Sequence, residues 1–188
     1  MANKIKYGLR NVYYAPITDN GTTITYGTPV ALKGGVNLSL SGVGDTNDFY
    51  ADDIIYFSST ANQGYEGDLE VALLDDDFLE DIIGLVADSN GALVENADIL
   101  PKPFALGFEV QGDTAGRRTW LYYCTATRPN QDAATKESGI TPQTDTLSIK
   151  SLPRHTDKKV KVVMEKTGAN TAAYNDFFTA VYESAGSI

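Results

Sequence analysis

Apolar and polar residues alternate at every second position in several short runs of this chain. One run, just before the turn QGDTAG, places Phe104, Leu106, Phe108 and Val110 on one parity. Alternation of period two is typical of a β-strand with one buried face. The same pattern recurs in VNLSL (36–40), DLEVALL (68–74), TDTLSIK (144–150) and KVKVVM (159–164). These runs predict a mainly β fold, an antiparallel β-sandwich or barrel of about eight strands joined mainly by hairpins.

Two further runs refine this prediction. Ile5, Tyr7 and Leu9 alternate on one parity and Val12 and Tyr14 on the other, which predicts a bend or bulge near residues 10–11. The turn DNG (19–21) then leads into TTITY, a natural hairpin partner. The run RTWLYYCTA (118–126) is apolar on both parities, so we expect a strand that is covered on both faces.

Two segments have helical spacing instead, and we expect one or two helices packed against the sheet. Asp77 as N-cap and Glu80 three residues later form a possible capping box. Near the C-terminus, Asn170 or Thr171 could cap a second helix. The apolar stripes of the two helices are Phe78, Leu79, Ile82, Ile83 and Val86, and Tyr174, Phe177, Phe178, Val181 and Tyr182.

The stretch NDFYADDIIYF (47–57) follows neither period. It lies in an excursion from Ser41 to Gly67, far longer than the usual hairpin loop of about 2–5 residues. Exposed on a monomer, its large apolar residues would be an aggregation liability. Aromatic residues with a few charges suit the core and rim of an interface. The alternative is that the segment folds back as an edge strand over its own core. A second long excursion, residues 128–143, has the composition of an exposed loop.

Length and charge bound the remaining possibilities. A chain of 188 residues fits one domain with a sizeable core. The net charge of −10 argues against a basic groove for nucleic acid. Residues 1–100 carry four basic and sixteen acidic side chains, a net of −12, whereas residues 101–188 carry eleven and nine, a net of +2. This polarity fits either two faces of a monomer or head-to-tail contacts between copies. Without an apolar run long enough to span a membrane or a secretory h-region, we expect a cytosolic protein.

No arrangement of residues points to catalysis or metal binding. DTNDFYADD (45–53) begins like a calcium loop, but Tyr50 replaces the required glycine and Tyr56 the final glutamate. His155 is the only histidine, has no nucleophile motif beside it and is expected to be solvated. Cys124 is the only cysteine, so no internal disulfide forms, and its aromatic strand predicts a small core residue. We therefore expect a protein that is not an enzyme and has no cofactor or metal.

The sequence resembles the major tail protein, or tail tube protein, of long-tailed (siphovirus) phages of Gram-positive bacteria. The resemblance runs almost end to end and is weakest at residues 132–143 and in the terminal ESAGSI. It rests on the order and spacing of YGLRNVYYAPI, YGTPVALKGGV, FYADDIIYF, NQGYEGDLEVALLDDDFLEDIIG, PKPFALGFE, RRTWLYYCTATRP and AAYNDFFTAVY.

The resemblance implies a structural role. Such proteins fold as a β-sandwich flanked by a helix and associate, usually as hexameric rings that stack into a hollow tube for ejection of the genome. It implies as partners copies of the same chain, a tape-measure protein, and tail terminator or distal tail proteins. DNA would pass without specific binding, and no membrane is involved. The location implied is the virion tail, assembled in the cytoplasm of the host bacterium.

These arguments together predict a single domain over residues 1–188 with an assembly loop at about 43–65. The run Ile5–Tyr14 and the residues after Tyr182 are weaker candidates for arms that reach a neighbour. Two alternatives remain: a tube subunit of a contractile injection or type VI-like secretion system, and a monomeric carbohydrate-binding β-sandwich, which the single Trp120 in a buried strand disfavours. The predicted inter-subunit contact residues are Phe49, Tyr50, Asp52, Asp53, Ile54, Ile55, Tyr56 and Phe57.

Overall fold

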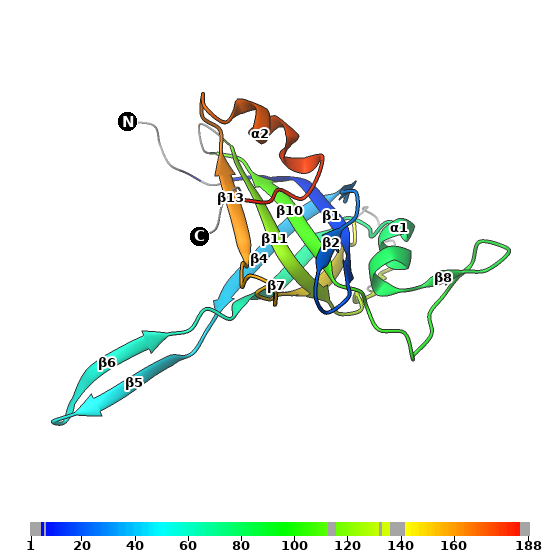
Figure 1. Cartoon of the computed structure of the whole chain (residues 1–188). Coiled ribbons are helices and arrows are strands. Elements are labelled where there is room, and N and C mark those ends of the chain that lie inside the picture. Colours follow the sequence, from blue (N-terminus) through cyan, green and yellow to red (C-terminus); the bar gives the residue numbers. More distant parts are fainter. Residues whose placement is uncertain (1–4, 6, 113–115, 132, 136–141, 185–188) are drawn as a thin grey trace.

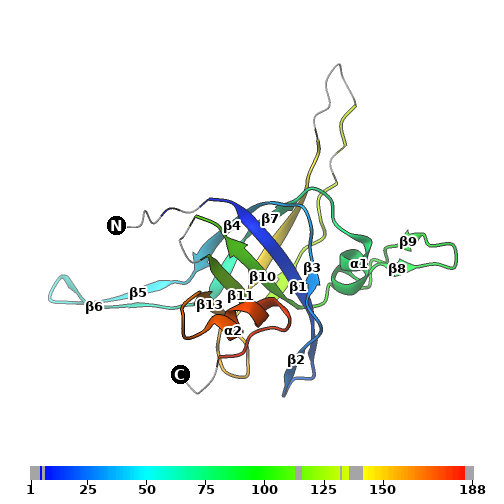
Figure 2. The ribbon, with the colours of Figure 1, turned by 90° about the horizontal axis from the view of Figure 1, so that it is seen from above.

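A computed structural model describes residues 5, 7–112, 116–131, 133–135 and 142–184 of the chain (Figures 1 and 2). Strands make up 47% of the described structure, which also has two short helices, and the sheets are antiparallel. The prediction of a mainly β, antiparallel fold is therefore confirmed. The main sheet has the order β2 (Ile24–Tyr26), β1 (Leu9–Asp19), β10 (Phe104–Val110), β11 (Arg117–Ala126), β12 (Asp145–Ser151), β7 (Gly64–Val71) and β4 (Gly35–Val43).

The remaining strands extend this sheet or form small ribbons. β3 (Val30–Ala31) pairs with β1, and β13 (Lys161–Glu165) pairs with β11. The two ribbons are β5 (Thr46–Ala51) with β6 (Ile54–Thr60), and β8 (Val86–Ala87) with β9 (Leu93–Val94). The main sheet curls until β4 approaches β1, since a Cβ on Gly35 would lie 2.9 Å from Val12 Cγ2.

The inside of the curled sheet holds the larger core. Its strands contribute, among others, Tyr14, Leu69, Phe104 and Leu121, all buried. Helix α1 (Asp76–Phe78), continued by a π-helical turn over Leu79–Ile83, closes one end of this interior. Phe78 lies edge-on to the rings of Tyr14 and Phe104, at centroid distances of 5.0 and 5.7 Å.

The outer face of β10 and β11 carries a second core. Trp120 and Tyr122 point to this face and are covered by the C-terminal segment, helix α2 (Thr171–Asn175) and a 3-10 turn over Asp176–Phe178. Figure 1 shows α2 near one end of β10, β11 and β13, with the chain that follows it crossing the sheet. Because Leu121 faces the inner core and Trp120 the outer one, the prediction that this strand is covered on both faces is confirmed.

Several local predictions are also confirmed. The register of β1 against β10 shifts between Arg10 and Tyr13, and Asn11 has a φ of 51°, which places a bulge where the parity changes. Ile17–Asp19 pairs with Ile24–Tyr26 across the DNG turn. Cys124 is buried in the inner core, and burial raises the pKa of its thiol to about 12.

Other local predictions are wrong or hold only in part. The first helix begins after Asp75, whose side chain makes no capping bond, so the capping box at Asp77 and Glu80 does not form. Val86 lies in β8 and is exposed rather than on the helix face. Asn170 is the N-cap residue of α2 but makes no side-chain capping bond; its Oδ1 accepts from the amide of Thr167 instead.

Parts of both predicted terminal arms contact the body of the same subunit. From Leu9 onward the N-terminal run belongs to β1 and pairs with β10, so the proposed arm over Ile5–Tyr14 is wrong for most of its length. At the C-terminus, Glu183 pairs with Arg154 of the body, and residues 185–188 lie outside the described residues. Within the described part of the chain, every helix is too short or too polar to cross a bilayer.

Candidate assembly surface

The excursion at 43–65 is a two-stranded ribbon that continues β4 and β7 away from the body, as Figure 1 shows. The segment that the sequence analysis named an assembly loop therefore consists of two paired strands, which neither period had indicated. Its strands β5 and β6 pair from Thr46–Thr60 at the base to Ala51–Ile54 at the tip. The chain thus presents a β-hairpin on which the predicted contact residues lie together.

The turn at the hairpin tip does not have a familiar hairpin sequence. Asp52 and Asp53 are its two central residues and both have positive φ, 52° and 60°. Two positive φ values are characteristic of a type I′ turn, the two-residue turn whose twist matches that of paired strands. Asn-Gly is the familiar sequence for such a turn, but Asp also tolerates this region. The only sequence signal for this turn is the pair of acidic residues between two apolar runs.

A bulge in β6 hides the strand periodicity. Phe49 pairs with Phe57 and Tyr50 with Ile55, which leaves Tyr56 without a cross-strand partner. Because cross-strand partners share a face, Phe49 and Phe57 lie on one face and Tyr50 and Ile55 on the other. The extra residue shifts the parity, so a strand follows no simple alternation. The outcome is a ribbon with large apolar side chains on both faces.

These side chains are exposed. The six large apolar residues of the hairpin have between 52% and 72% of their surface accessible. The alternative in which the segment folds back over its own core does not occur in this structure. Assignment of the eight predicted residues to an inter-subunit contact stays a prediction.

The base of the hairpin is firmly joined to the body. The amide of Gln63 donates to the carbonyl of Val43 at 2.8 Å, and that of Ala61 to Asp45 at 2.9 Å. Gly44 lies between these bonds, and a Cβ there would come within 1.8 Å of the carbonyl oxygen of Ala61. These contacts carry the pairing of β4 and β7 into β5 and β6, so the direction of the hairpin is fixed by hydrogen-bonded backbone.

A second projection, the β8–β9 hairpin, extends from the opposite side of the body in Figure 2. It was not predicted, although the Asn-Gly pair at residues 90–91 is a hairpin signal. Asp88 organises its turn by accepting hydrogen bonds from the amides of Ala92 and Asn90, which hold the pKa of its carboxyl below the ordinary value. Val86 and Val94, which pair across this ribbon, are exposed.

Buried ionic groups stabilise the body beneath the C-terminal segment. Glu109 is almost fully buried and accepts hydrogen bonds from Arg10, Asn11 and Arg118. Burial alone would raise the pKa of this carboxyl, but the three donors hold it below its ordinary value. Arg118 also lies over the ring of Tyr174, 4.0 Å from its centroid, which ties the network to α2.

A second buried charged residue, the cation Arg154, anchors the end of the described chain. Its guanidinium donates to Asp157 at 2.6 Å and to Glu183 at 3.1 Å, and lies 4.2 Å from the centroid of Tyr122. Burial alone would lower the pKa of this guanidinium, but the hydrogen bonds to Glu183 and Asp157 raise it above its ordinary value. The Arg154 contacts hold the residue after Tyr182 against the body.

The side chains considered as candidates for catalysis or ligand binding have structural surroundings. His155 is partly exposed and lies 3.6 Å from Asp19. Trp120 is buried, and its Nε1 donates to the carbonyl of Phe177 at 2.7 Å. Among the described residues, no group of three or more His, Cys, Asp or Glu side chains is arranged to hold a metal ion.

Comparison with known proteins adds no family or relative: the chain matches no family profile and no curated protein sequence.

Proposed function

We propose that this chain is a structural protein that polymerises with copies of itself, as the tube subunit of a long phage tail. The observation that carries the proposal is the β5–β6 hairpin, which holds six large apolar side chains in solvent on a ribbon that leaves the body. Exposed apolar surface of this kind marks an interaction site.

The two-faced character of the hairpin supports copies of the same chain as partner. Phe49 and Phe57 on one face and Tyr50 and Ile55 on the other are all covered only when the ribbon lodges between surfaces. A hairpin that inserts into a neighbour makes a heterologous contact, in which each copy both donates and accepts. Such contacts close into rings or continue as filaments, and a tail tube is built from both arrangements.

The specific role in a phage tail rests on the sequence resemblance. In that role the subunits form rings, six to a ring, which stack around a tape-measure protein and end at terminator and distal tail proteins. The assembled tube conducts DNA during ejection without binding it specifically. A net charge of −10 per subunit supports this last step, because an acidic wall repels the phosphate backbone. A positive inner wall in an assembled ring would contradict it.

Two other functions are less well supported. A tube subunit of a contractile injection or type VI-like secretion system would share the fold and the self-association, and neighbouring genes for a sheath protein would identify it. A carbohydrate-binding module needs an exposed aromatic platform. Trp120 is buried, and the exposed aromatic residues of the hairpin are divided between its two faces.

The test is assembly of the purified protein with and without its hairpin aromatics. Negative-stain electron microscopy of the concentrated wild-type protein is expected to show rings or filaments. The double substitution Tyr56→Ser and Phe57→Ser removes two exposed side chains, so the subunit should stay folded and soluble but form neither.

A matched control replaces two other exposed apolar residues. Leu73 and Leu100 are 70% and 80% exposed and lie outside the hairpin. The double variant Leu73→Ser and Leu100→Ser should assemble like the wild type. Polymerisation of the hairpin variant at wild-type concentrations would exclude the hairpin as the contact, and a wild-type protein that stays monomeric at every concentration would exclude the proposed function.

A further inference from the structure

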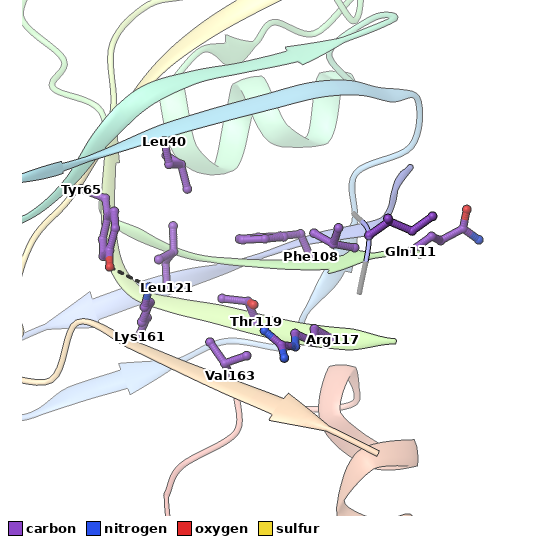
Figure 3. Close-up of a pocket in the computed structure, with 11 residues that line it drawn as sticks. Leu40, Tyr65, Phe108, Gln111, Arg117, Thr119, Leu121, Lys161 and Val163 are labelled. Carbon is purple, nitrogen blue, oxygen red and sulfur yellow. Dashed lines mark hydrogen bonds between the residues drawn. The ribbon is translucent and has the colours of Figure 1, made fainter. Parts of the chain in front are cut away.

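In the part of the chain that the structure describes, the interior of the curled sheet is closed at one end only. Phe104, at the first end of β10, packs against Phe78 of α1. At the other end of the same strand, Phe108 and Val110 line an open cleft of about 400 Å³ (Figure 3). β10 runs from one end of the curled sheet to the other. Helix α1 fills the end at Phe104, and the described residues leave the end at Val110 open.

A fork in the sheet creates this cleft. β13 pairs with residues 117–121 of β11, whereas β12 pairs with residues 124–126 on the same side of that strand. The two arms diverge from the fork, one formed by β13 and the other by β12, β7 and β4. Figure 3 shows Leu40 and Tyr65 on one arm, Lys161 and Val163 on the other, and Leu121 between them.

The cleft combines apolar walls with a basic rim. Leu40, Phe108, Leu121 and Val163 contribute apolar surface, while Arg117 and Lys161 are its charged residues. Arg117 also forms an ion pair with Glu165 at 3.7 Å, so the basic character of the rim rests mainly on Lys161. None of the described residues that line it is acidic. The ammonium of Lys161 donates to the hydroxyl of Tyr65 at 2.6 Å and lies 4.3 Å from the centre of its ring, which holds the cation across the mouth. This surface suits an apolar segment with negative charge.

We propose that the cleft receives the tip of the β5–β6 hairpin from another copy of this chain. The inference rests on the proposed self-assembly and names the surface that accepts the hairpin. The tip offers the complementary chemistry: Ile54 and Tyr56 are apolar and exposed, and the acidic turn residues Asp52 and Asp53 would meet the cationic rim. Opposite charge across a contact fixes its register and excludes wrong partners.

A hairpin cannot fill the cleft of its own subunit. Leu40 and Tyr65 belong to β4 and β7, the two strands that run out into the hairpin. At about 3.3 Å per residue, the eight residues that follow Val43, from Gly44 to Ala51, carry the tip roughly 26 Å past the end of β4. The hydrogen-bonded base at Val43–Gln63 and Asp45–Ala61 prevents a fold back. Each subunit therefore donates its hairpin to one neighbour and accepts another.

Disulfide cross-linking tests this contact directly. The native Cys124 is buried, so it does not compete in the reaction. The Tyr56→Cys variant, with a thiol near the hairpin tip, is mixed with the Val163→Cys variant, with a thiol at the cleft, under mild oxidation. A mixed disulfide dimer is expected. The control mixture of Tyr56→Cys with Leu73→Cys, which is exposed elsewhere, should give none.

A second pair of variants tests the same contact through assembly. Val163 is partly exposed on β13, so Val163→Glu adds a negative charge at the cleft with little effect on the fold, and Val163→Thr is the matched neutral change. The Glu variant should lose polymerisation and the Thr variant should keep it. Mixed with the hairpin variant Tyr56→Ser and Phe57→Ser, the Glu variant should form a dimer that grows no further, because the mixture has one intact hairpin and one intact cleft.

The outcomes separate this inference from the proposed function. If the wild type assembles but the mixed disulfide is missing and Val163→Glu still polymerises, the cleft does not accept the hairpin, although the proposed function stands. Disulfides of Tyr56→Cys with itself alone would indicate hairpin-to-hairpin contacts and would also overturn the inference. A wild type that never assembles overturns both proposals.

Discussion

The β5–β6 hairpin and the C-terminal segment carry the same set of aromatic residues, two Phe and two Tyr each, but bury them very differently. In the hairpin, Phe49, Tyr50, Tyr56 and Phe57 are exposed. In the C-terminal segment, the corresponding set is Tyr174, Phe177, Phe178 and Tyr182, which packs in the outer core.

The difference lies in what faces each segment. The C-terminal segment lies on the outer face of β11, where Trp120 donates to the carbonyl of Phe177 and Tyr122 to that of Tyr182 at 2.9 Å. Among the described residues, none forms a sheet opposite either face of the hairpin, whose apolar side chains are exposed. Aromatic content therefore does not decide burial; an available sheet surface does. Of these two segments, only the hairpin leaves its aromatic side chains exposed in the subunit.

The largest expected effect separates the two regions by stability. Phe177 is fully buried, so Phe177→Ala should lower the free energy of unfolding by about 3–5 kcal/mol through lost burial and a cavity. Urea denaturation followed by Trp120 fluorescence measures this. A loss below about 1 kcal/mol would show that the C-terminal segment is not part of the stable core.

A smaller loss of stability is expected when the buried carboxylate of Glu109, beneath the C-terminal segment, is removed. Glu109→Gln removes a buried carboxylate with three donors and should cost about 1.5–3 kcal/mol at pH 7. Because the folded state lowers the pKa of Glu109, its contribution is fully present above the ordinary value of 4.5 and is lost as the pH falls through the lowered one. Denaturation of both proteins from pH 7 to pH 3 should show their difference shrinking with acid. A constant difference would contradict this role.

The smallest expected effect is in the hairpin. Tyr56→Ser with Phe57→Ser should change the free energy of unfolding of the subunit by no more than about 0.5 kcal/mol, since both side chains are exposed. The comparison is made below the concentration at which the wild type assembles. A loss comparable with that of Phe177→Ala would mean that the hairpin packs on its own subunit in solution.

Period-two alternation predicted the strands of the main sheet because each has one face on a core. The absence of alternation in residues 118–126, where Trp120 and Leu121 are apolar neighbours of opposite parity, predicted that β11 is covered on both faces. The same reasoning failed for the hairpin because the bulge at Tyr56 shifts the parity and Asp52–Asp53 replaces the familiar turn sequence. The strands of the hairpin can be recognised in the sequence only once their pairing is known.

The candidate contact residues were identified from their composition, but the cleft was not. Leu40, Tyr65, Leu121 and Val163 come from four strands, and each continues an ordinary strand pattern. Nothing in the local sequence distinguishes them from core residues. The cleft results from the fork of β12 and β13 along β11, which depends on pairing between distant segments. The first helix shows the same limit, because Val86 fits its stripe but pairs with Val94 instead.

Hydrogen exchange of the backbone amides in residues 46–60 most directly tests whether copies of this chain cover the hairpin. The amides are compared at concentrations below and above assembly, with those of β10 and β11 as an internal reference. Exchange in the hairpin should slow markedly in the assembled sample while the reference amides stay equally protected. Equal exchange of the hairpin in the two samples would contradict the account.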